Sequence, residues 1–146
     1  MKIALAADHA GYEEKERIKG TLDALGVAYE DMGTDSCESV DYPDYALKAA
    51  EAVASGKADQ GLLVCGSGTG MAIAANKVPG VRAAVAWNET IARLAREHND
   101  ANVLSIPARF LDDAAIKQII NAWFSASFDA GRHAKRVDKI KQIEKD

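Results

Sequence analysis

The sequence predicts a three-layer α/β fold, in which helices cover both faces of a five-stranded parallel sheet. Short apolar runs typical of strands alternate with segments of helical periodicity five times along the chain, as repeated βαβ units require. The 146 residues, 48% of them hydrophobic, are enough to bury one core, and no linker or low-complexity stretch divides them. We therefore expect a single domain over residues 1–146, doubly wound like the Rossmann and flavodoxin folds, with an extra C-terminal helix.

The strands are placed by short apolar runs that end in turn or polar residues. The runs KIALAA and QGLLVC are the clearest, because each is almost continuously apolar, as buried parallel strands are. Strands are expected at residues 2–7, 27–32, 60–65, 81–86 and 102–106.

The helices are placed by periodicity and by residues that start or stop a helix. Ile18, Leu22 and Leu25 recur at helical spacing, and Gly26 follows them where a glycine ends a helix. Pro43 suits a first helical turn, and Asp112 suits an N-cap. Helices are expected at residues 12–25, 43–53, 71–77, 89–97, 112–124 and 130–146.

Composition and charge exclude several classes of protein. The 18 basic and 22 acidic side chains give a net charge of −4, whereas a broad nucleic-acid surface would be basic. The apolar runs are much shorter than the roughly 20 residues of a membrane helix, and the N-terminus does not resemble a signal peptide. Two cysteines do not make a disulfide framework. We expect a cytoplasmic protein that binds neither nucleic acid nor membrane.

The end of the first strand and the loop after the third are expected to meet at one crevice. In open parallel sheets, ligands bind beyond the carboxyl ends of the strands, at the point where the strand order reverses. If the order is 2-1-3-4-5, this point lies between the first and third strands. These strands end in Asp8-His9 and in the segment CGSGTG, residues 65–70.

The glycine-rich loop has two possible uses. Its glycines let the backbone approach a ligand closely, so that several N–H groups and the positive end of the next helix face one anion. Alternatively, the glycines serve only the packing of a tight strand-to-helix turn. The loop follows the third strand rather than the first and lacks Gly-Lys-Ser/Thr, so it is neither a dinucleotide-binding motif nor a P-loop.

Cys65 also has two interpretations. A free cysteine at a strand end is commonly a small buried hydrophobic residue. Here it faces loop amides and a helix N-terminus, which lower the pKa of a thiol and can make it a base near neutral pH. We favour the functional interpretation slightly, and we assign no role to Cys37 in the loop after the second strand.

The histidines offer further candidates. His9 is either a residue that fixes the loop or a ligand contact, and His98 is either a favourable charge at a helix C-terminus or a site residue. The spacing of His, Cys and acidic residues matches no metal-binding motif, so the sequence predicts no metal site.

The C-terminal helix carries a basic face and a thin apolar stripe. Arg132 and Arg136 are four residues apart and share one face, which is either solvated or suited to bidentate binding of phosphate. The stripe consists of Val137, Ile140 and Ile143. A helix this polar is not expected to stand alone, so we predict that it docks on a neighbouring subunit.

Five segments of the chain together resemble the ribose-5-phosphate isomerase B family, which also contains bacterial galactose-6-phosphate isomerase subunits. The segments are IALAADHAG, GTDSCESVDYPDYA, LLVCGSGTGMAIAANKVPGVRAAV, REHNDANVLSIPAR and GRHAKRV. The resemblance implies interconversion of ribose 5-phosphate and ribulose 5-phosphate through an enediolate, within the pentose phosphate pathway and without a cofactor. The alternatives are an isomerase of allose 6-phosphate or galactose 6-phosphate, and a non-catalytic flavodoxin-like binding domain.

The resemblance also implies roles for individual residues. Cys65 would be the base that moves a proton between C2 and C1, and His98 would assist opening of the sugar ring. The loop, with Ser67 as a further catalytic residue, would stabilise the enediolate oxygens. The substrate-binding residues would be Asp8, His9, Gly66, Ser67, Gly68, Thr69, Gly70, Asn99, Arg109, Arg132 and Arg136.

The position of His98 predicts a shared site. Its helix should run antiparallel to the strands, so His98 should lie at the opposite edge of the sheet from Cys65. One chain could then hardly bring both residues to the same substrate. We therefore predict a homodimer, or a tetramer built from it, in which His98 and Asn99 complete the site of a second subunit.

Overall fold

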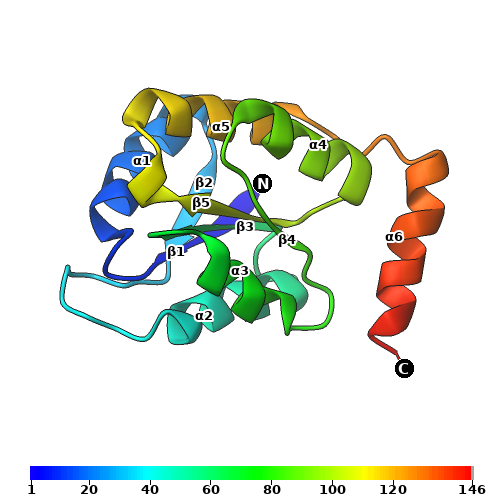
Figure 1. Ribbon diagram of the computed structural model, residues 1–146, viewed down its shortest axis with the longest axis horizontal. Coiled ribbons are helices and arrows are strands. Elements are labelled where there is room, and N and C mark those ends of the chain that lie inside the picture. Colours follow the sequence, from blue (N-terminus) through cyan, green and yellow to red (C-terminus); the bar gives the residue numbers. More distant parts are fainter. Residues whose placement is uncertain (146) are drawn as a thin grey trace.

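The computed structural model describes residues 1–145 and confirms the predicted parallel α/β fold (Figure 1). Every strand pairing in the sheet is parallel. The strands are β1 (Lys2–Ala7), β2 (Ala28–Asp31), β3 (Gln60–Cys65), β4 (Ala83–Val85) and β5 (Val103–Pro107).

The strand order is β2-β1-β3-β5-β4, so the expected order 2-1-3-4-5 is wrong in its last two strands. All residues of β5 are buried and it pairs with β3, whereas the short β4 is half-buried and forms the edge. A continuously buried strand needs neighbours on both sides, while a short strand is tolerated at an edge. The reversal between β1 and β3 remains, so the crevice lies where it was expected.

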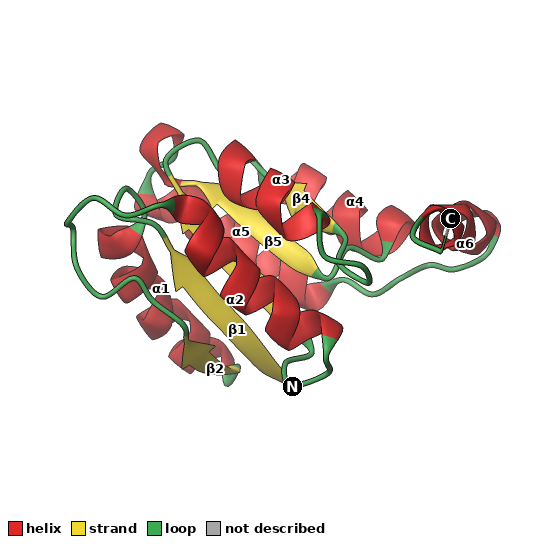
Figure 2. Cartoon of the chain, turned by 90° about the horizontal axis from the view of Figure 1, so that it is seen from below, coloured by secondary structure: helices red, strands yellow, loops and turns green. Residues whose placement is uncertain are grey.

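The helices form two layers, one on each face of the sheet (Figures 1 and 2). Ile3 and Leu5 of β1 face the layer of α1 (Tyr12–Leu25), α4 (Glu89–Asn99) and α5 (Asp113–Ser125). Ala4 and Ala6 face the layer of α2 (Tyr42–Ala54) and α3 (Thr69–Asn76). This alternation follows from the two-residue period of a strand and gives the protein two apolar cores.

The predicted signals at helix ends act as expected. The Asp112 side chain accepts a hydrogen bond of 2.8 Å from the amide of Ala115, as an N-cap does. Gly26 ends α1 in the left-handed conformation, with φ of 69°. The helix after the glycine-rich loop begins at Thr69, two residues earlier than predicted, so its first amides belong to the loop.

A fully buried lysine fixes α1 to β2. The ammonium of Lys15 donates hydrogen bonds of 2.7 and 2.6 Å to the two carboxylate oxygens of Asp31. Burial alone would raise the pKa of Asp31, but hydrogen bonds from Lys15, Lys19 and the Gly33 amide outweigh it and lower that pKa. Asp31 therefore stays ionised to lower pH and supplies the negative charge that a buried lysine requires as a partner.

The last helix, α6 (Arg132–Ile143), stands outside the three layers, beyond the end of α4 (Figure 2). Val137 is buried, but Ile140 and Ile143 are 41% and 71% exposed, so part of the predicted apolar stripe has no cover within the chain. Across residues 1–145, no helix has the length and apolar character needed to cross a membrane.

Candidate active site

A pocket of about 500 Å³ opens at the carboxyl ends of β1 and β3. It brings together the predicted residues that follow β1, those of the glycine-rich loop except Gly68, and Arg109 from beyond β5. Gly68 instead packs against the end of β5, where a Cβ on it would lie 3.2 Å from the Pro107 nitrogen. The lining residues are Asp8, His9, Ala10, Tyr42, Cys65, Gly66, Ser67, Thr69, Gly70, Ile73 and Arg109.

Cys65 lies at the inner wall of this pocket, only 4% exposed. The amide of Gly68 donates a hydrogen bond of 3.0 Å to its Sγ. Cys65 is thus both a buried residue of the α2–α3 core and a member of the pocket, which combines the two interpretations of its position.

The expected lowering of the Cys65 pKa is wrong. Burial raises the pKa of the thiol, and the Asp8 carboxylate raises it further. Hydrogen bonds from the amides of Met71, Gly68 and Ser67 lower it, but they do not outweigh burial. The prediction failed because the sequence shows which amides follow the strand but not how deeply the thiol is buried. That burial depends on packing by segments distant in the sequence.

The loop between β3 and α3 turns its backbone towards the pocket. Gly68 has a φ of 76°, a conformation that favours glycine, and it immediately precedes the first residue of α3. The Ser67 hydroxyl accepts a hydrogen bond of 3.3 Å from the Thr69 amide. The positive end of α3 therefore faces the same space as the thiol and favours negative charge there.

Asp8 and His9 are held by backbone amides. Asp8 Oδ1 accepts a hydrogen bond of 2.9 Å from Gly11, and His9 Nδ1 accepts one of 3.1 Å from Val40. An imidazole that accepts at Nδ1 carries its proton at Nε2. His9 thus fixes a loop with one nitrogen and retains a donor for a ligand at the other, so both predicted uses of His9 are compatible.

Arg109 supplies positive charge to the pocket. It lies in a short 3-10 turn after β5, residues Ala108–Phe110, and its amide donates a hydrogen bond of 3.1 Å to the carbonyl oxygen of Gly66. Its side chain packs over Gly66, where a Cβ would come within 3.2 Å of Arg109 Cδ. None of the ion pairs formed within residues 1–145 involves Arg109, so its guanidinium is available to an anionic ligand.

Tyr42 is a lining residue that sequence reasoning missed. It begins α2, whose N-terminus lies at the same sheet edge, and its ring covers Gly70. A Cβ at Gly70 would lie 2.6 Å from Tyr42 Cε1, so the glycine is needed for this contact. The useful signal was Pro43, which predicted a helix start at this edge directly after Tyr42.

The remaining predicted residues do not line the pocket. His98 lies in the last turn of α4, shortly before β5 begins. β5 pairs with β3 so that Val103 is opposite Gly61 and Pro107 is opposite Cys65. Four residues of strand, about 13 Å, therefore separate the two ends of this pairing. This geometry confirms that, within one chain, Cys65 lies at the carboxyl ends of the strands and His98 lies towards their amino ends, which are opposite sides of the sheet.

Asn99, Arg132 and Arg136 are also distant from the thiol pocket. Asn99 lines a separate pocket of about 450 Å³, together with Arg82 of the β4 side and Ile140 of α6. The two arginines lie in the first turns of α6. None of the three lines the thiol pocket of its own chain.

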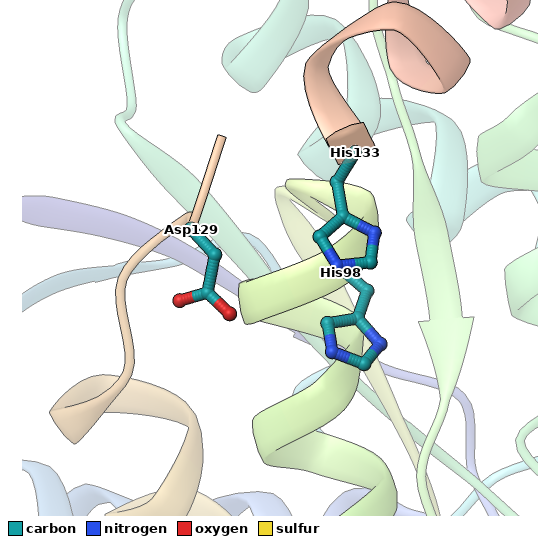
Figure 3. Close-up of side chains that lie close together, drawn as sticks. All are labelled: His98, Asp129 and His133. Carbon is teal, nitrogen blue, oxygen red and sulfur yellow. The ribbon is translucent and has the colours of Figure 1, made fainter. Parts of the chain in front are cut away.

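Two histidines meet at the junction of α4 and α6 (Figure 3). The rings of His98 and His133 are stacked, with centroids 4.1 Å apart and an interplanar angle of 12°. Partial desolvation, the neighbouring His98 and two arginines lower the pKa of His133. The Asp129 carboxylate lies beside the rings, so the fold assembles possible metal ligands that the sequence spacing did not predict.

Comparison with known proteins identifies the family. The sequence profile of the Ribose/Galactose Isomerase family matches residues 3–140. The chain belongs to this family. The resemblance inferred from the sequence motifs is thereby confirmed, and the chain is an isomerase.

Individual relatives match over nearly their whole length. The chain is 46% identical over 143 residues to ribose-5-phosphate isomerase B of Escherichia coli, covering 98% of this chain and 96% of that protein. The structure of Clostridium thermocellum ribose-5-phosphate isomerase B is 51% identical, with a TM-score of 0.97 and coverage of 99% and 98%. The Mycoplasma genitalium enzyme, solved with bound ribulose-5-phosphate, is 39% identical, with a TM-score of 0.95 and coverage of 99% and 97%.

Proposed function

We propose that this isomerase interconverts ribose 5-phosphate and ribulose 5-phosphate, with Cys65 as the base. The observation that carries this proposal is the position of Cys65 Sγ in the pocket wall, 3.0 Å from the Gly68 amide and beside the N-terminus of α3. A base and a set of oxyanion donors in one pocket are the two parts that enediolate chemistry needs.

The reaction moves a carbon-bound proton from C2 to C1, first from C2 to Cys65 and then from Cys65 to C1. Cys65 takes the C2 proton of the open-chain aldose phosphate, and the electron pair left at C2 forms the enediolate double bond as the C1 oxygen becomes negative. The amides of the loop stabilise that oxygen, and one well-placed donor is worth about 3–4 kcal/mol. The thiol then returns its proton to C1, and the proton of the C2 hydroxyl passes to the C1 oxygen, so that C2 becomes the ketone and C1 carries a hydroxyl.

The phosphate is bound by donors at the rim of the pocket. His9 Nε2 and the Arg109 guanidinium are the available groups, and a guanidinium matches phosphate oxygens with paired donors. Binding the phosphate away from C1 and C2 fixes the orientation of the reacting carbons and contributes to lowering the barrier. Asp8 and Ser67 line the same pocket and contact the sugar.

A second copy of the chain completes the site. His98 assists ring opening there, Asn99 holds a sugar hydroxyl, and Arg132 and Arg136 add to the phosphate site. Two observations support this arrangement: these residues lie outside the pocket of their own chain, and α6 stands apart with Ile140 and Ile143 exposed. The protein is then a homodimer, or a tetramer of such dimers, with α6 docked on the partner.

The predicted single domain, pathway, location and lack of a cofactor are consistent with this activity. Residues 1–146 act as one domain, and the enzyme serves the pentose phosphate pathway in the cytoplasm. Isomerisation by proton transfer is redox-neutral overall and consumes no second substrate, so the chemistry calls for no cofactor.

A direct assay tests the proposal. Wild-type protein is compared with Cys65→Ala on ribose 5-phosphate, allose 6-phosphate and galactose 6-phosphate, and Cys37→Ala is the matched control because its thiol lies outside the pocket. We expect ribose 5-phosphate to be the best substrate, and Cys65→Ala to lose about 10²- to 10⁴-fold in kcat. Retained activity in Cys65→Ala would remove the cysteine from the base role, and a preference for either hexose phosphate would refute the pentose assignment.

A further inference from the structure

The junction of α4 and α6 holds three side chains of metal-binding type. One ligand atom from each of His98, Asp129 and His133 lies within 4.8 Å of the other two. Figure 3 shows the stacked imidazoles with the Asp129 carboxylate beside them. Two imidazoles and one carboxylate, with a fourth position open to water, are a recurrent ligand set for Zn²⁺.

The backbone holds these side chains near one another before any ion binds. His98 lies in the last turn of α4, and the amide of Asp129 donates a hydrogen bond of 2.9 Å to the carbonyl oxygen of Glu97 in that turn. The chain then reverses through Ala130 and Gly131, with φ of 55° and 52°. His133 follows in the first turn of α6, its amide bonded to the Ala130 carbonyl at 2.9 Å.

The distances allow the cluster to close on a metal ion. With Zn–N and Zn–O bonds of about 2.0–2.1 Å, the ligand atoms of a tetrahedral site are roughly 3.3 Å apart. The most distant pair in the cluster, at up to 4.8 Å, must therefore approach by about 1.5 Å. Rotation of side chains achieves this, because His98 and His133 are half-buried and Asp129 is exposed.

The surrounding charges select the kind of ion. The cluster contains one carboxylate, and Arg132 and Arg136 flank His133 on α6. Mg²⁺ and Ca²⁺ bind chiefly through several oxygen ligands, which this cluster lacks. Ions with strong affinity for imidazole, such as Zn²⁺, Ni²⁺ and Cu²⁺, gain enough from two nitrogen ligands to bind beside the arginines.

We propose that His98, Asp129 and His133 form a binding site for a divalent transition-metal ion, and that binding of the ion inhibits the isomerase. Inhibition follows because a metal-bound imidazole can no longer transfer a proton to the sugar ring oxygen. This second part rests on the proposed function, in which His98 assists ring opening. The binding itself does not depend on that function.

Calorimetric titration of the tag-free protein with Zn²⁺ tests the site directly. We expect one ion per chain in wild type and also in Cys65→Ala. Binding by Cys65→Ala would exclude the Cys65 thiol as a ligand. Asp129→Asn and His133→Gln should each weaken binding about tenfold or more. Unchanged affinity in these two variants, or loss of binding in Cys65→Ala, would overturn the site, and unfolding curves of the variants verify that each is folded.

Activity measurements test the inhibitory part. Asp129→Asn should isomerise ribose 5-phosphate as wild type does without metal, but need about tenfold or more Zn²⁺ for half-inhibition. Equal sensitivity of the two proteins would refute inhibition through this cluster. If neither protein isomerises ribose 5-phosphate, the proposed function fails, and the calorimetric result still decides whether the metal site exists.

Discussion

The buried hydroxyl of Ser105 donates a hydrogen bond of 2.7 Å to the carbonyl oxygen of Gly68. The amide of the same glycine donates to Cys65 Sγ at 3.0 Å. Ser105 lies in the middle of β5 and is otherwise surrounded by apolar residues of that strand. Ser105 thus holds the carbonyl group of Gly68 in place from the core of the protein, while the amide of Gly68 contacts the Cys65 thiol.

Substitution Ser105→Ala should lower both stability and activity. The Gly68 carbonyl would keep only the longer hydrogen bond of 3.3 Å from the Ala72 amide, so we expect a loss of about 0.5–1.5 kcal/mol in the free energy of unfolding. Without the hydrogen bond from Ser105, the Gly68 amide would be held less firmly in its orientation towards Cys65 Sγ. Because the proposed base would then be less well positioned, kcat should fall more than KM rises. Urea unfolding and steady-state kinetics measure the two effects, and Ser125→Ala, an exposed position, is the control. Wild-type stability in Ser105→Ala would show that the bond contributes nothing.

The raised pKa of Cys65 predicts a rate that increases with pH. With Cys65 as the proposed base, the thiolate is the active form. A raised pKa leaves less thiolate near neutrality, so kcat/KM should rise until the pH reaches the alkaline pKa of the thiol. The Asp8 carboxylate contributes to raising that pKa, so Asp8→Asn should move the inflection of kcat/KM to lower pH.

The amide replacement leaves the local structure in place, because Asn retains an oxygen that can accept the hydrogen bond from Gly11. The shift of the inflection is therefore the informative quantity, whatever the loss in absolute rate from a weaker sugar contact. An inflection that stays at the wild-type pH, or moves upward, would contradict the assignment of the alkaline limb to Cys65.

Two glycines of the first βα unit differ sharply in the space around them. A Cβ at Gly11 would lie 2.1 Å from the carbonyl oxygen of Val64, in the backbone of a central strand, whereas a Cβ at Gly20 meets nothing within 4 Å. Gly11→Ala should cost about 3 kcal/mol or more, because the strand cannot move aside. Gly20→Ala, within α1, should instead stabilise by about 0.4–1 kcal/mol. Unfolding midpoints compare the pair, and equal effects would refute the packing argument.

Local patterns predicted the elements of this fold but not the neighbours of each element. The apolar runs around Cys65 and Val103 marked two buried strands, yet only long-range pairing places β5 between β3 and β4. The pKa of Cys65 was predicted in the wrong direction for the same reason, since burial depends on what packs over the thiol. Tyr42 and the pair of His98 and His133 come from segments whose proximity no spacing reveals.

Separation of His98 from Cys65 within one chain predicts that inactive subunits can rescue one another. In a mixed dimer of Cys65→Ala and His98→Ala chains, one site carries both substitutions and the other carries neither. After complete exchange of equal amounts, half of the dimers are mixed, so activity should return to about one quarter of wild type in a two-fold symmetric dimer. Each variant alone should stay inactive.

The matched control mixes Cys65→Ala with Arg109→Ala. These two residues line the same pocket of one chain, so every site of the mixed dimer keeps one defect and no activity should return. Subunit exchange is verified by native mass spectrometry before the assay. Recovery in neither mixture would mean that His98 does not act across the dimer and that ring opening depends on residues of the same chain. Recovery in the control as well as in the test mixture would show that the regained activity does not come from sites shared between subunits.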